Sequence, residues 1–447
     1  MNDVSLPASP DAVRPSSPRK VVIIGGGAGG LELAATLGRK HGRDAVTLVD
    51  ARPFHVWKPS LHEAAAGTLD IHQEGLSYLM MGALSHFGFV LGGVTEIDRN
   101  ARTITVAPVR DANGIEVVPE RRIGYEILVL AIGSTSNFFG TPGADEHALT
   151  LDTIDGAEHF RLTMLKQMVQ VDQAKATSPD ARLNVVIVGG GATGVELAAE
   201  LHEASHVISA YGLPHFKPSR DLAITLIEGA PRVLAALPER ISAAATERLQ
   251  SMNVQIETGA KVSEVGPDYV NVSDGRTFEA QMCLWAAGIA GPALLKTLDL
   301  PLNRIGQLEV DGTLQTSDPN IYAIGDCSAA PWKDGKSVPA RAQAAHQQAD
   351  YLATRITDRL KGRTSSSATY VYRDHGSLVS LGSSAGVGSL MGKLSGRGLF
   401  VSGTLARLMY MSLHLMHHKA VLGVSRTATL ALARLLMRRT RPRVKLH

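Results

Sequence analysis

Cysteine is scarce in this 447-residue sequence, where Cys283 and Cys327 are the two representatives. Two cysteines exclude a fold cross-linked by several disulfides and favour a reducing compartment. Aromatic residues account for 5% and charged residues for 19%, whereas 44% are hydrophobic, as is typical of globular α/β proteins. No stretch reaches the roughly 18 uncharged apolar residues of a membrane-spanning helix. We therefore expect no transmembrane span and no ion pumping across a bilayer by this chain itself.

Acidic residues are absent from the last part of the sequence, since none follows Asp374. The 73 residues after it carry a net charge of +11, which leaves −8 on the first 374 residues. This asymmetry predicts a basic appendage on an acidic body. Residues 1–19 are rich in Pro and Ser and contain no apolar core. They predict a disordered tail rather than a signal peptide.

One glycine pattern occurs twice, in VVIIGGGAGGLELAATL from Val21 and in VVIVGGGATGVELAAEL from Val185. Each copy is an apolar β-branched run, a glycine cluster and a helix of small residues, which is the layout that binds a dinucleotide pyrophosphate. Its glycines make the turn, admit the phosphates and let the helix pack on its strand. They are Gly25, Gly27 and Gly30 (with Ala28 opening the helix) in the first copy, and Gly189, Gly191 and Gly194 in the second. Two copies predict two dinucleotides at helix N-termini.

A carboxylate follows each copy at the end of the next strand. Asp50 lies 20 residues after Gly30, where an acidic residue accepts hydrogen bonds from an adenosine ribose. The alternative is an aspartate that serves a strand-end turn. Glu228 in LAITLIEGA takes the corresponding place in the second copy and favours NADH, because its charge repels the 2′-phosphate of NADPH. Arg232, four residues later, leaves NADPH open.

Three further strand ends complete the pattern. LVLAIGS, with Gly133, closes the first unit and CLWAAGI, with Gly288, closes the second. IYAIGDC then returns to the first unit and brings Asp326 to the ribityl or pyrophosphate portion of a flavin, unless Asp326 merely makes a turn; the next helix is expected near Ala340. This nesting predicts an α/β fold of two Rossmann-like domains, the two-dinucleotide-binding flavoprotein fold, with non-covalent FAD and NADH. The predicted order is a tail at 1–19, the FAD-binding domain at 20–150 and 291–372, the NADH-binding domain at 151–290, and a basic amphipathic membrane-anchoring region at 373–447.

Glu196 follows the third glycine of the second copy by two residues. It is a candidate proton relay near the nicotinamide or the flavin. Glu32 has the same offset in the first copy, where hydride transfer is not expected. Both glutamates could therefore serve only the electrostatics of a helix N-terminus. No residue set predicts a metal site.

Flavoproteins of this architecture differ in the electron acceptor that they reduce. ARPFHVWKPSLHEAAAGTLD, after the first acidic strand, lacks the Cys pair of disulfide reductases. Cys283 and Cys327 are expected to be packing residues rather than the catalytic cysteines of sulfide–quinone oxidoreductases. Over about residues 20–447 the sequence resembles the type II NADH:quinone oxidoreductases, particularly the proteobacterial respiratory form. The similar motifs are HVWKPSLHEAAAGTLD, LAIGSTSNFFGTPG, LPERI, LWAAGI, IYAIGDC, RAQAAHQQA, DHGSLVSLGSSAGVGSLMG and RPRVKLH.

The resemblance implies FAD-dependent oxidation of NADH with two-electron reduction of a membrane quinone, without proton pumping. It also implies that Gln343 and Gln347, on one helix face, present amides to a quinone carbonyl. A polar stripe packed under the flavin is the alternative. Lys58, beside Trp57, matches a loop near the flavin or is an exposed loop lysine, and His346 is expected to be structural.

Apolar residues alternate at helical spacing with cations in two C-terminal runs, 401–419 and 432–439. These runs predict helices lying on an anionic membrane surface. Packing in a homodimer is the alternative, and the lack of aromatic residues among the charges argues against nucleic acid. We expect a peripheral protein on the cytoplasmic face of the bacterial inner membrane. Two other functions stay open: a soluble NADH-dependent flavoprotein reductase of ferredoxin or peroxide, and a non-catalytic NADH-sensing flavoprotein.

Overall fold

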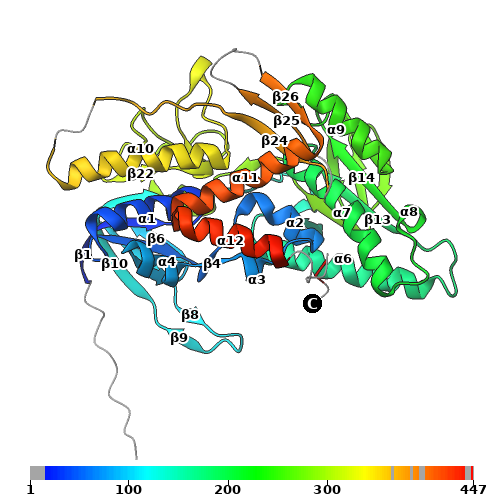
Figure 1. Cartoon of the computed structure of the whole chain (residues 1–447), viewed down its shortest axis with the longest axis horizontal. Coiled ribbons are helices and arrows are strands. Elements are labelled where there is room, and N and C mark those ends of the chain that lie inside the picture. The colour runs from blue at the N-terminus through cyan, green and yellow to red at the C-terminus, as the bar shows by residue number, and fades with distance from the viewer. Residues whose placement is uncertain (1–15, 364–366, 383–385, 392–397, 438–443, 446–447) are drawn as a thin grey trace, which may run out of the picture. The chain divides into compact units, whose positions relative to one another are not determined.

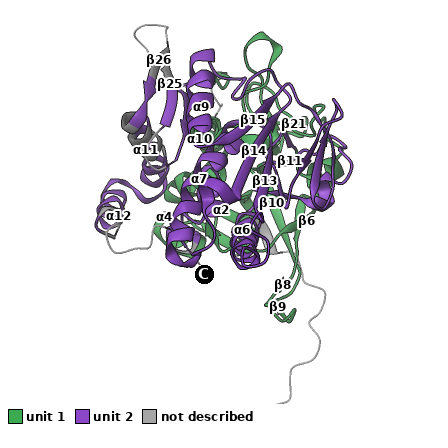
Figure 2. Ribbon diagram, turned by 90° about the vertical axis from the view of Figure 1, so that its right-hand side faces the viewer, with its two compact units in different colours: residues 1–55, 76–133, 291–372 green, residues 56–75, 134–290, 373–447 purple. Residues whose placement is uncertain are grey.

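The computed structural model describes residues 16–363, 367–382, 386–391, 398–437 and 444–445. The chain divides into two compact units, which Figure 2 shows in different colours. Unit 1 comprises Met1–His55, Leu76–Gly133 and Gly291–Tyr372, and unit 2 comprises Val56–Gly75, Ser134–Ala290 and Arg373–His447. Most of the predicted N-terminal tail, residues 1–15, lies outside the described residues, while its last four residues belong to the first strand, β1 (Ser16–Ile24).

A seven-stranded sheet forms the centre of unit 1. Its order is β5–β2–β1–β10–β7–β6, and β22 pairs with the second half of β10. The strands β5, β2, β1, β10 and β22 are parallel to one another, whereas β7 pairs antiparallel with both of its neighbours, β10 and β6. The strands are β1, β2 (Val46–Asp50), β5 (Gly88–Leu91), β6 (Val94–Asp98), β7 (Thr103–Val106), β10 (Arg121–Leu130) and β22 (Ile321–Ala323).

Helices α1 (Ala28–His41) and α10 (Ala342–Leu360) pack against each other in unit 1, and α4 (Tyr78–Ser85) packs on α1 (Figure 1). Gly42 caps the end of α1, and the cations Arg39 and Lys40 lie in its last turn beside the negative end of the helix dipole. The smaller elements are β3 (Phe54–His55), β4 (Leu76–Ser77), β8 (Val109–Arg110), β9 (Glu116–Val118), β21 (Leu308–Glu309), β23 (Ser328–Ala329), η2 (Ala293–Leu298), η3 (Gly325–Cys327) and η4 (Lys333–Gly335).

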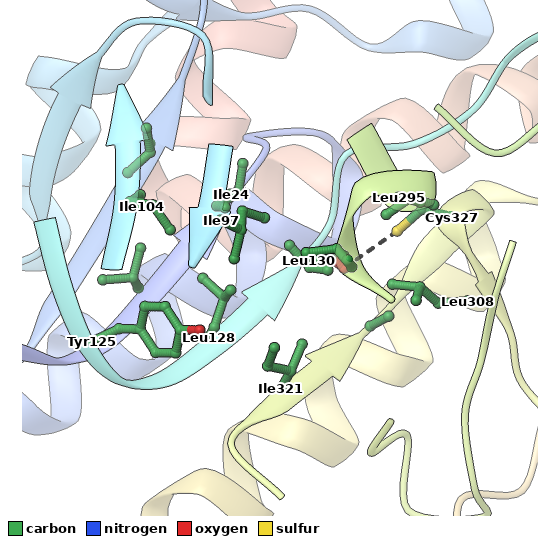
Figure 3. Packing of buried hydrophobic residues seen from close by; sticks show 14 of the residues in the cluster. Ile24, Ile97, Ile104, Tyr125, Leu128, Leu130, Leu295, Leu308, Ile321 and Cys327 are labelled. Carbon is green, nitrogen blue, oxygen red and sulfur yellow. Dashed lines mark hydrogen bonds between the residues drawn. The ribbon is translucent and has the colours of Figure 1, made fainter. Parts of the chain in front are cut away.

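The core of unit 1 contains one of the two cysteines. Cys327 is fully buried, and its Sγ lies 3.4 Å from the carbonyl oxygen of Leu130 (Figure 3). The carbonyl oxygen of Ile324 lies 3.2 Å from the same Sγ. Cys283 is buried in the core of unit 2. Burial raises the pKa of each thiol to about 12, so neither is a thiolate at neutral pH. The expectation that both cysteines are packing residues is confirmed.

Unit 2 is built on a five-stranded sheet of order β12–β19–β13–β14–β15, in which all neighbours are parallel. The connections from β12 through β13 and β14 to β15 are βαβ crossovers, as expected for a buried parallel sheet. The strands are β12 (Ala148–Thr150), β13 (Leu183–Val188), β14 (Leu222–Glu228), β15 (Val254–Thr258) and β19 (Met282–Trp285). The main helices are α2 (Leu61–Ala66), α6 (Ile154–Ala174), α7 (Ala192–Gly212) and α9 (Glu239–Ser251).

Smaller elements complete unit 2. A second sheet comprises β16 (Val262–Val265), β17 (Tyr269–Val272) and β18 (Thr277–Glu279), and β11 (Thr135–Ser136) pairs with β20 (Ile289–Ala290). Short helices are η1 (Lys58–Ser60), α3 (Ile71–Glu74), α5 (Ala144–His147) and α8 (Pro218–Asp221). The C-terminal part forms β24 (Gly376–Ser380), β25 (Gly386–Met391), β26 (Gly398–Ser402), α11 (Gly403–Leu422) and α12 (Val424–Met437).

Residues 373–447, predicted as a separate region, belong to unit 2, and the unit boundaries differ from the predicted domain boundaries at two further places. Residues 134–150 belong to unit 2 because β12 pairs with β19 of its sheet. Residues 56–75 also belong to unit 2 because α2 packs on α6 and α7 (Figure 2). Both differences come from contacts distant in sequence, which local patterns do not reveal. The assignment of each domain to a cofactor stays a prediction.

The chain's last described residues are fastened to unit 2. Val444 is buried, and the N–H of Lys445 donates to the carbonyl of Gly67 at 2.8 Å. The guanidinium of Arg161 donates to the carbonyl of Lys445 at 3.2 Å. Helix α11 also packs against β24, β25 and β26, so the C-terminal part contacts unit 2 along this helix as well as at residues 444–445. No helix in the described part of the chain is long and apolar enough to cross a membrane.

Candidate functional site

The first glycine turn leads from β1 into α1. Gly25 has φ +97°, and a Cβ there would collide with the carbonyl of Ala131. A Cβ on Gly30 would collide with the carbonyl of Gly25, so this position packs the helix against its own turn. A Cβ on Gly27, by contrast, meets no described atom within 4 Å. The helix therefore begins at an exposed, uncapped backbone whose N–H groups suit an anion.

Asp50 ends β2 beside this turn. Its Oδ2 accepts the N–H of Gly26 at 2.6 Å, and its Oδ1 accepts the N–H of Arg52 at 2.8 Å. Burial raises the pKa of Asp50, although these two donors oppose that shift. The hydroxyl of Tyr78 donates to the carbonyl of Gly26 at 2.8 Å and holds the other side of the turn.

The second glycine turn repeats this arrangement in unit 2. Gly189 has φ +110°, and a Cβ on Gly194 would collide with its carbonyl, whereas Gly191 again meets nothing within 4 Å among the described residues. Oε2 of Glu228 accepts the N–H of Gly190 at 2.6 Å, as Asp50 accepts that of Gly26. Both copies therefore hold a carboxylate directly beside an open helix N-terminus.

Arg232 is engaged by its own turn. Its guanidinium donates to the carbonyls of Leu234 at 3.2 Å, Ala235 at 3.0 Å and Leu237 at 2.8 Å. Such a guanidinium is directed toward the backbone rather than held ready for a phosphate. The sequence pattern could not show this, because the partners are backbone carbonyls.

The two glycines at strand ends, Gly133 and Gly288, differ in the space around them. Gly133 has φ +70° and open space around a Cβ, whereas a Cβ on Gly288 would collide with the ring of Phe139. In unit 1 the N–H of Gly325 donates to Oε1 of Gln348 at 2.6 Å. Asp326, the next residue, is half-buried, and its carbonyl accepts from Nε2 of Gln307 at 2.8 Å.

Helix α10 begins beside α1. The carbonyl of Ala345 lies 2.9 Å from where a Cβ on Gly29 would be, so the two helix starts touch closely. Gln343 and Gln347 are both half-buried on α10, one turn apart. Nδ1 of His346, between them, contacts a carboxylate oxygen of Glu32 on α1. Gln348, which is buried and holds Gly325, was missed by the sequence analysis.

Lys58 lies in η1 of unit 2. Its side chain is largely exposed, and its ammonium donates to the carbonyl of Ser134 at 3.0 Å. Trp57, just before it, is buried and stacks on two histidines of α11, with ring centroids 5.9 Å from His414 and 4.8 Å from His417. The loop before α2 is thereby joined to the C-terminal region within unit 2.

Glu196 is buried in the first turns of α7. Its Oε1 accepts the N–H of Ser380 at 3.0 Å, and its Oε2 lies 3.5 Å from Nδ1 of His62. Burial raises the pKa of Glu196 well above its ordinary value and so favours the protonated, neutral form of its carboxyl group. His62 was missed by the sequence analysis; its place one residue before Glu63 on α2 carries no pattern of its own.

The C-terminal runs are helical at residues 403–419 and 432–437, whereas residues 401–402 end the strand β26. α11 and α12 meet at Gly423, and Lys419 and Arg426 are exposed on either side of it. Exposed apolar side chains accompany these cations. They are Met416 (64% exposed), Val424 (68%), Leu432 (58%) and Leu436 (65%). The predicted cations Arg438, Arg439, Arg441 and Arg443 lie outside the described residues.

Comparisons with known proteins agree with this geometry. Residues 19–349 match the family described as pyridine nucleotide-disulphide oxidoreductases. A type II NADH:quinone oxidoreductase of Haemophilus influenzae is 40% identical over 96% of this chain and 100% of that protein, and one of Staphylococcus aureus is 30% identical over 84% and 90%. NDH2 of Plasmodium falciparum in complex with NADH has the same fold, with a TM-score of 0.77 at 20% identity over 96% of this chain and 100% of that one. The chain belongs to the type II NADH:quinone oxidoreductases.

Proposed function

We propose that this chain oxidises NADH by way of non-covalently bound FAD and reduces a membrane quinone by two electrons, without pumping protons. The observation that carries the proposal is the pair of open helix N-termini at Gly27 and Gly191, each beside an anchored carboxylate. Membership of the type II NADH:quinone oxidoreductases supports the choice of substrates.

The residues of unit 1 fit FAD. Backbone N–H groups at the start of α1 open onto the free space in front of Gly27, where a pyrophosphate would be held. Asp50 is fixed beside them for a ribose hydroxyl, and Asp326 supplies a polar group near the start of α10 for the ribityl or pyrophosphate portion. When bound, FAD accepts a hydride from NADH and passes two electrons to the quinone.

The residues of unit 2 fit NADH. Glu228 is held next to the start of α7, where its carboxylate accepts a hydrogen bond from a ribose hydroxyl and repels a 2′-phosphate. The engagement of Arg232 with three backbone carbonyls supports NADH over NADPH, because no guanidinium of this turn is then directed at a phosphate.

Replacing Glu228 by alanine is expected to raise the Kd for NADH by about tenfold while the FAD content stays unchanged, because a hydrogen bond to a charged group contributes about 1.5–3 kcal/mol. Titration of the holoenzyme with NADH checks this. Glu239→Ala, at an exposed position on α9, is the matched control. Loss of FAD from the Glu228 variant would mean that the two domains hold the opposite cofactors.

A quinone fits the remaining polar groups better than a disulfide does. Gln343 and Gln347 are one turn apart on α10 and have amide donors for a quinone carbonyl. Glu196, whose pKa is raised by burial, is the proposed source of a proton for the reduced quinone. The cysteines are buried thiols with high pKa values, which argues against thiol chemistry despite the name of the matching family.

The C-terminal helices are proposed to lie on an anionic membrane, on the cytoplasmic face of the bacterial inner membrane, where NADH is available. Exposed apolar side chains and exposed cations on both α11 and α12 support this proposal. Each Lys or Arg near such a surface contributes about 1 kcal/mol. Packing of these helices in a homodimer is the competing role.

Replacing both Leu432 and Leu436 by aspartate is expected to weaken binding to phosphatidylglycerol vesicles by about 100-fold, because each leucine buried in the interface contributes roughly 1.5–3 kcal/mol. Co-sedimentation measures the binding. The control replaces two equally exposed apolar residues of the β8–β9 hairpin, Ile115 and Val117, in the same way. If the α12 variant still binds vesicles but becomes monomeric, the helices serve dimerisation instead.

Stopped-flow absorbance separates the proposed function from the two alternatives. Quinone reduction predicts rapid loss of flavin absorbance on mixing with NADH and rapid recovery on mixing with a short-chain quinone. A reductase of ferredoxin or peroxide would recover with those acceptors and not with quinone. An NADH sensor would lose its flavin absorbance too slowly to sustain turnover.

A further inference from the structure

A second buried titratable group faces Glu196. His62 lies on α2, which packs against α7, and its Nδ1 is 3.5 Å from Oε2 of Glu196. The two side chains are 2% and 8% exposed. The other ring nitrogen, Nε2, is buried and has no hydrogen-bond partner among the described residues. Buried polar atoms are rarely left in this condition, so each instance calls for a physical reason.

Burial favours the neutral form of both members of the pair. Burial lowers the pKa of His62 to about 4, although a hydrogen bond to the carbonyl of Pro59 opposes the shift. Burial also raises the pKa of Glu196, and the carboxylates of Glu63 and Glu200 raise it further. The pair therefore holds one exchangeable acid proton, on the carboxyl group, and one ring N–H.

The remaining charges on the packed elements change this picture little. On α6, which also packs against α2, the guanidinium of Arg161 is paired with Glu158 at 2.7 Å. On β24, the contact to Glu196 is the backbone N–H of Ser380 rather than a charge. On α7, the carboxylate of Glu200 accepts from the hydroxyl of Thr68 at 2.9 Å. Within this group, His62 is the cation-forming side chain that contacts the carboxyl of Glu196.

The same pairing occurs at the other glycine copy. Glu32 has the same offset on α1 as Glu196 has on α7, and Nδ1 of His346 contacts its carboxylate. The two histidines come from different helices, α10 and α2, and neither belongs to the repeated sequence. The pairing was therefore not copied with the repeat. The pair in unit 1 is partly open to solvent, whereas the pair in unit 2 is buried.

We propose that His62 is the positioning residue that returns a proton to Glu196 after each turnover. This inference rests on the proposed function, in which NADH, quinone and one proton from the medium give NAD⁺ and quinol. When Glu196 releases its carboxyl proton, its O–H bond breaks and a buried carboxylate is left. Nε2 of His62 then takes a proton from the medium and Nδ1 gives its own to the carboxylate. The ring ends neutral in the other tautomer, so charge and protons balance for this transfer. It regains the first tautomer before the next turnover by losing the Nε2 proton to the medium and gaining one at Nδ1.

An infrared pH titration of the oxidised holoenzyme tests the pairing without any turnover. The carboxylic C=O band that disappears in Glu196→Gln is followed in the wild type, in His62→Asn and in His202→Asn. His202, a half-buried histidine farther along α7, is the matched control. Without the imidazole ring beside it, the carboxylate of Glu196 is less stabilised. The midpoint in His62→Asn is therefore expected to rise by about one pH unit or more, while the midpoint in His202→Asn equals that of the wild type.

A kinetic comparison of the same variants tests the return of the proton. In His62→Asn, a single reoxidation of the flavin by quinone is expected to stay within about twofold of the wild type, because Glu196 is already protonated, whereas steady-state turnover falls by about tenfold or more. A merely structural defect would lower both rates together. His62→Gln replaces the asparagine variant if the latter loses FAD.

Equal infrared midpoints in His62→Asn and the wild type, or a wild-type band that does not titrate before the protein unfolds, overturn the inference. So does an equal loss in single and steady-state turnovers. Failure of the wild type to reduce quinone at all would instead refute the proposed function, and it would leave the infrared result standing as a separate measurement.

Discussion

Valine at Gly27 is expected to abolish stable FAD binding, and valine at Gly191 to abolish NADH binding while FAD is retained. Neither change should disturb the fold, because a Cβ at either position meets no described protein atom within 4 Å. The side chain would instead occupy the space through which a pyrophosphate approaches the helix N-terminus. Each lost charge-assisted hydrogen bond is worth about 1.5–3 kcal/mol, so affinity should fall by at least about tenfold per bond.

Flavin content of the purified variants and calorimetric titration with NADH measure the two effects. Gly212→Val is the matched control, since Gly212 ends α7 at an exposed position and a Cβ there also meets nothing within 4 Å among the described residues. Its flavin content and NADH affinity should equal those of the wild type. A Gly27 variant that binds FAD normally would show that the first turn does not hold the pyrophosphate.

Replacing Glu196 by glutamine is expected to slow flavin reoxidation by quinone by about 100-fold and to leave flavin reduction by NADH within about twofold of the wild type. Glutamine keeps the size of the side chain and an acceptor for the N–H of Ser380, but it carries no acid proton. Stopped-flow measurement of the two half-reactions separates them. Equal slowing of both would assign Glu196 to the structure of α7 rather than to proton transfer.

The same glutamate predicts a direction of pH dependence. Burial raises the pKa of Glu196, so the acid form persists to a higher pH than in an ordinary glutamate and disappears as the pH rises through that pKa. Quinone-dependent reoxidation in the wild type should therefore be fast on the acidic side and slow on the alkaline side. The residual rate of Glu196→Gln should lack this alkaline decline.

Local patterns predicted the parts of the site that are formed by neighbours in sequence. A strand, a glycine turn and a helix start are contiguous, so the roles of Gly25 and Gly30 follow from their spacing, and the structure shows the close packing that excludes a side chain at each. The sequence also predicted the strand that ends at Asp50 and the helix expected near Ala340. The helix begins at Ala342, and in both elements the pattern of apolar residues marks the boundary.

Long-range contacts explain what the sequence did not reveal. Gln348 could not be distinguished from Gln347 until its amide was seen to accept the N–H of Gly325. His62 meets Glu196 because α2 packs against α7, more than a hundred residues away along the chain. The same packing assigns residues 56–75 to unit 2. Arg232 was ambiguous because a guanidinium can serve a phosphate or its own turn, and its three carbonyl contacts appear only in three dimensions.

The absorption spectrum of the purified protein, recorded before and after anaerobic addition of NADH, tests the central assignment most directly. If the two glycine turns hold FAD and NADH, the protein is yellow as isolated or after incubation with FAD. Its flavin absorption bands then fade within the time of one turnover after NADH is added. A protein that stays colourless with excess FAD, or a yellow one whose bands survive NADH, would contradict it.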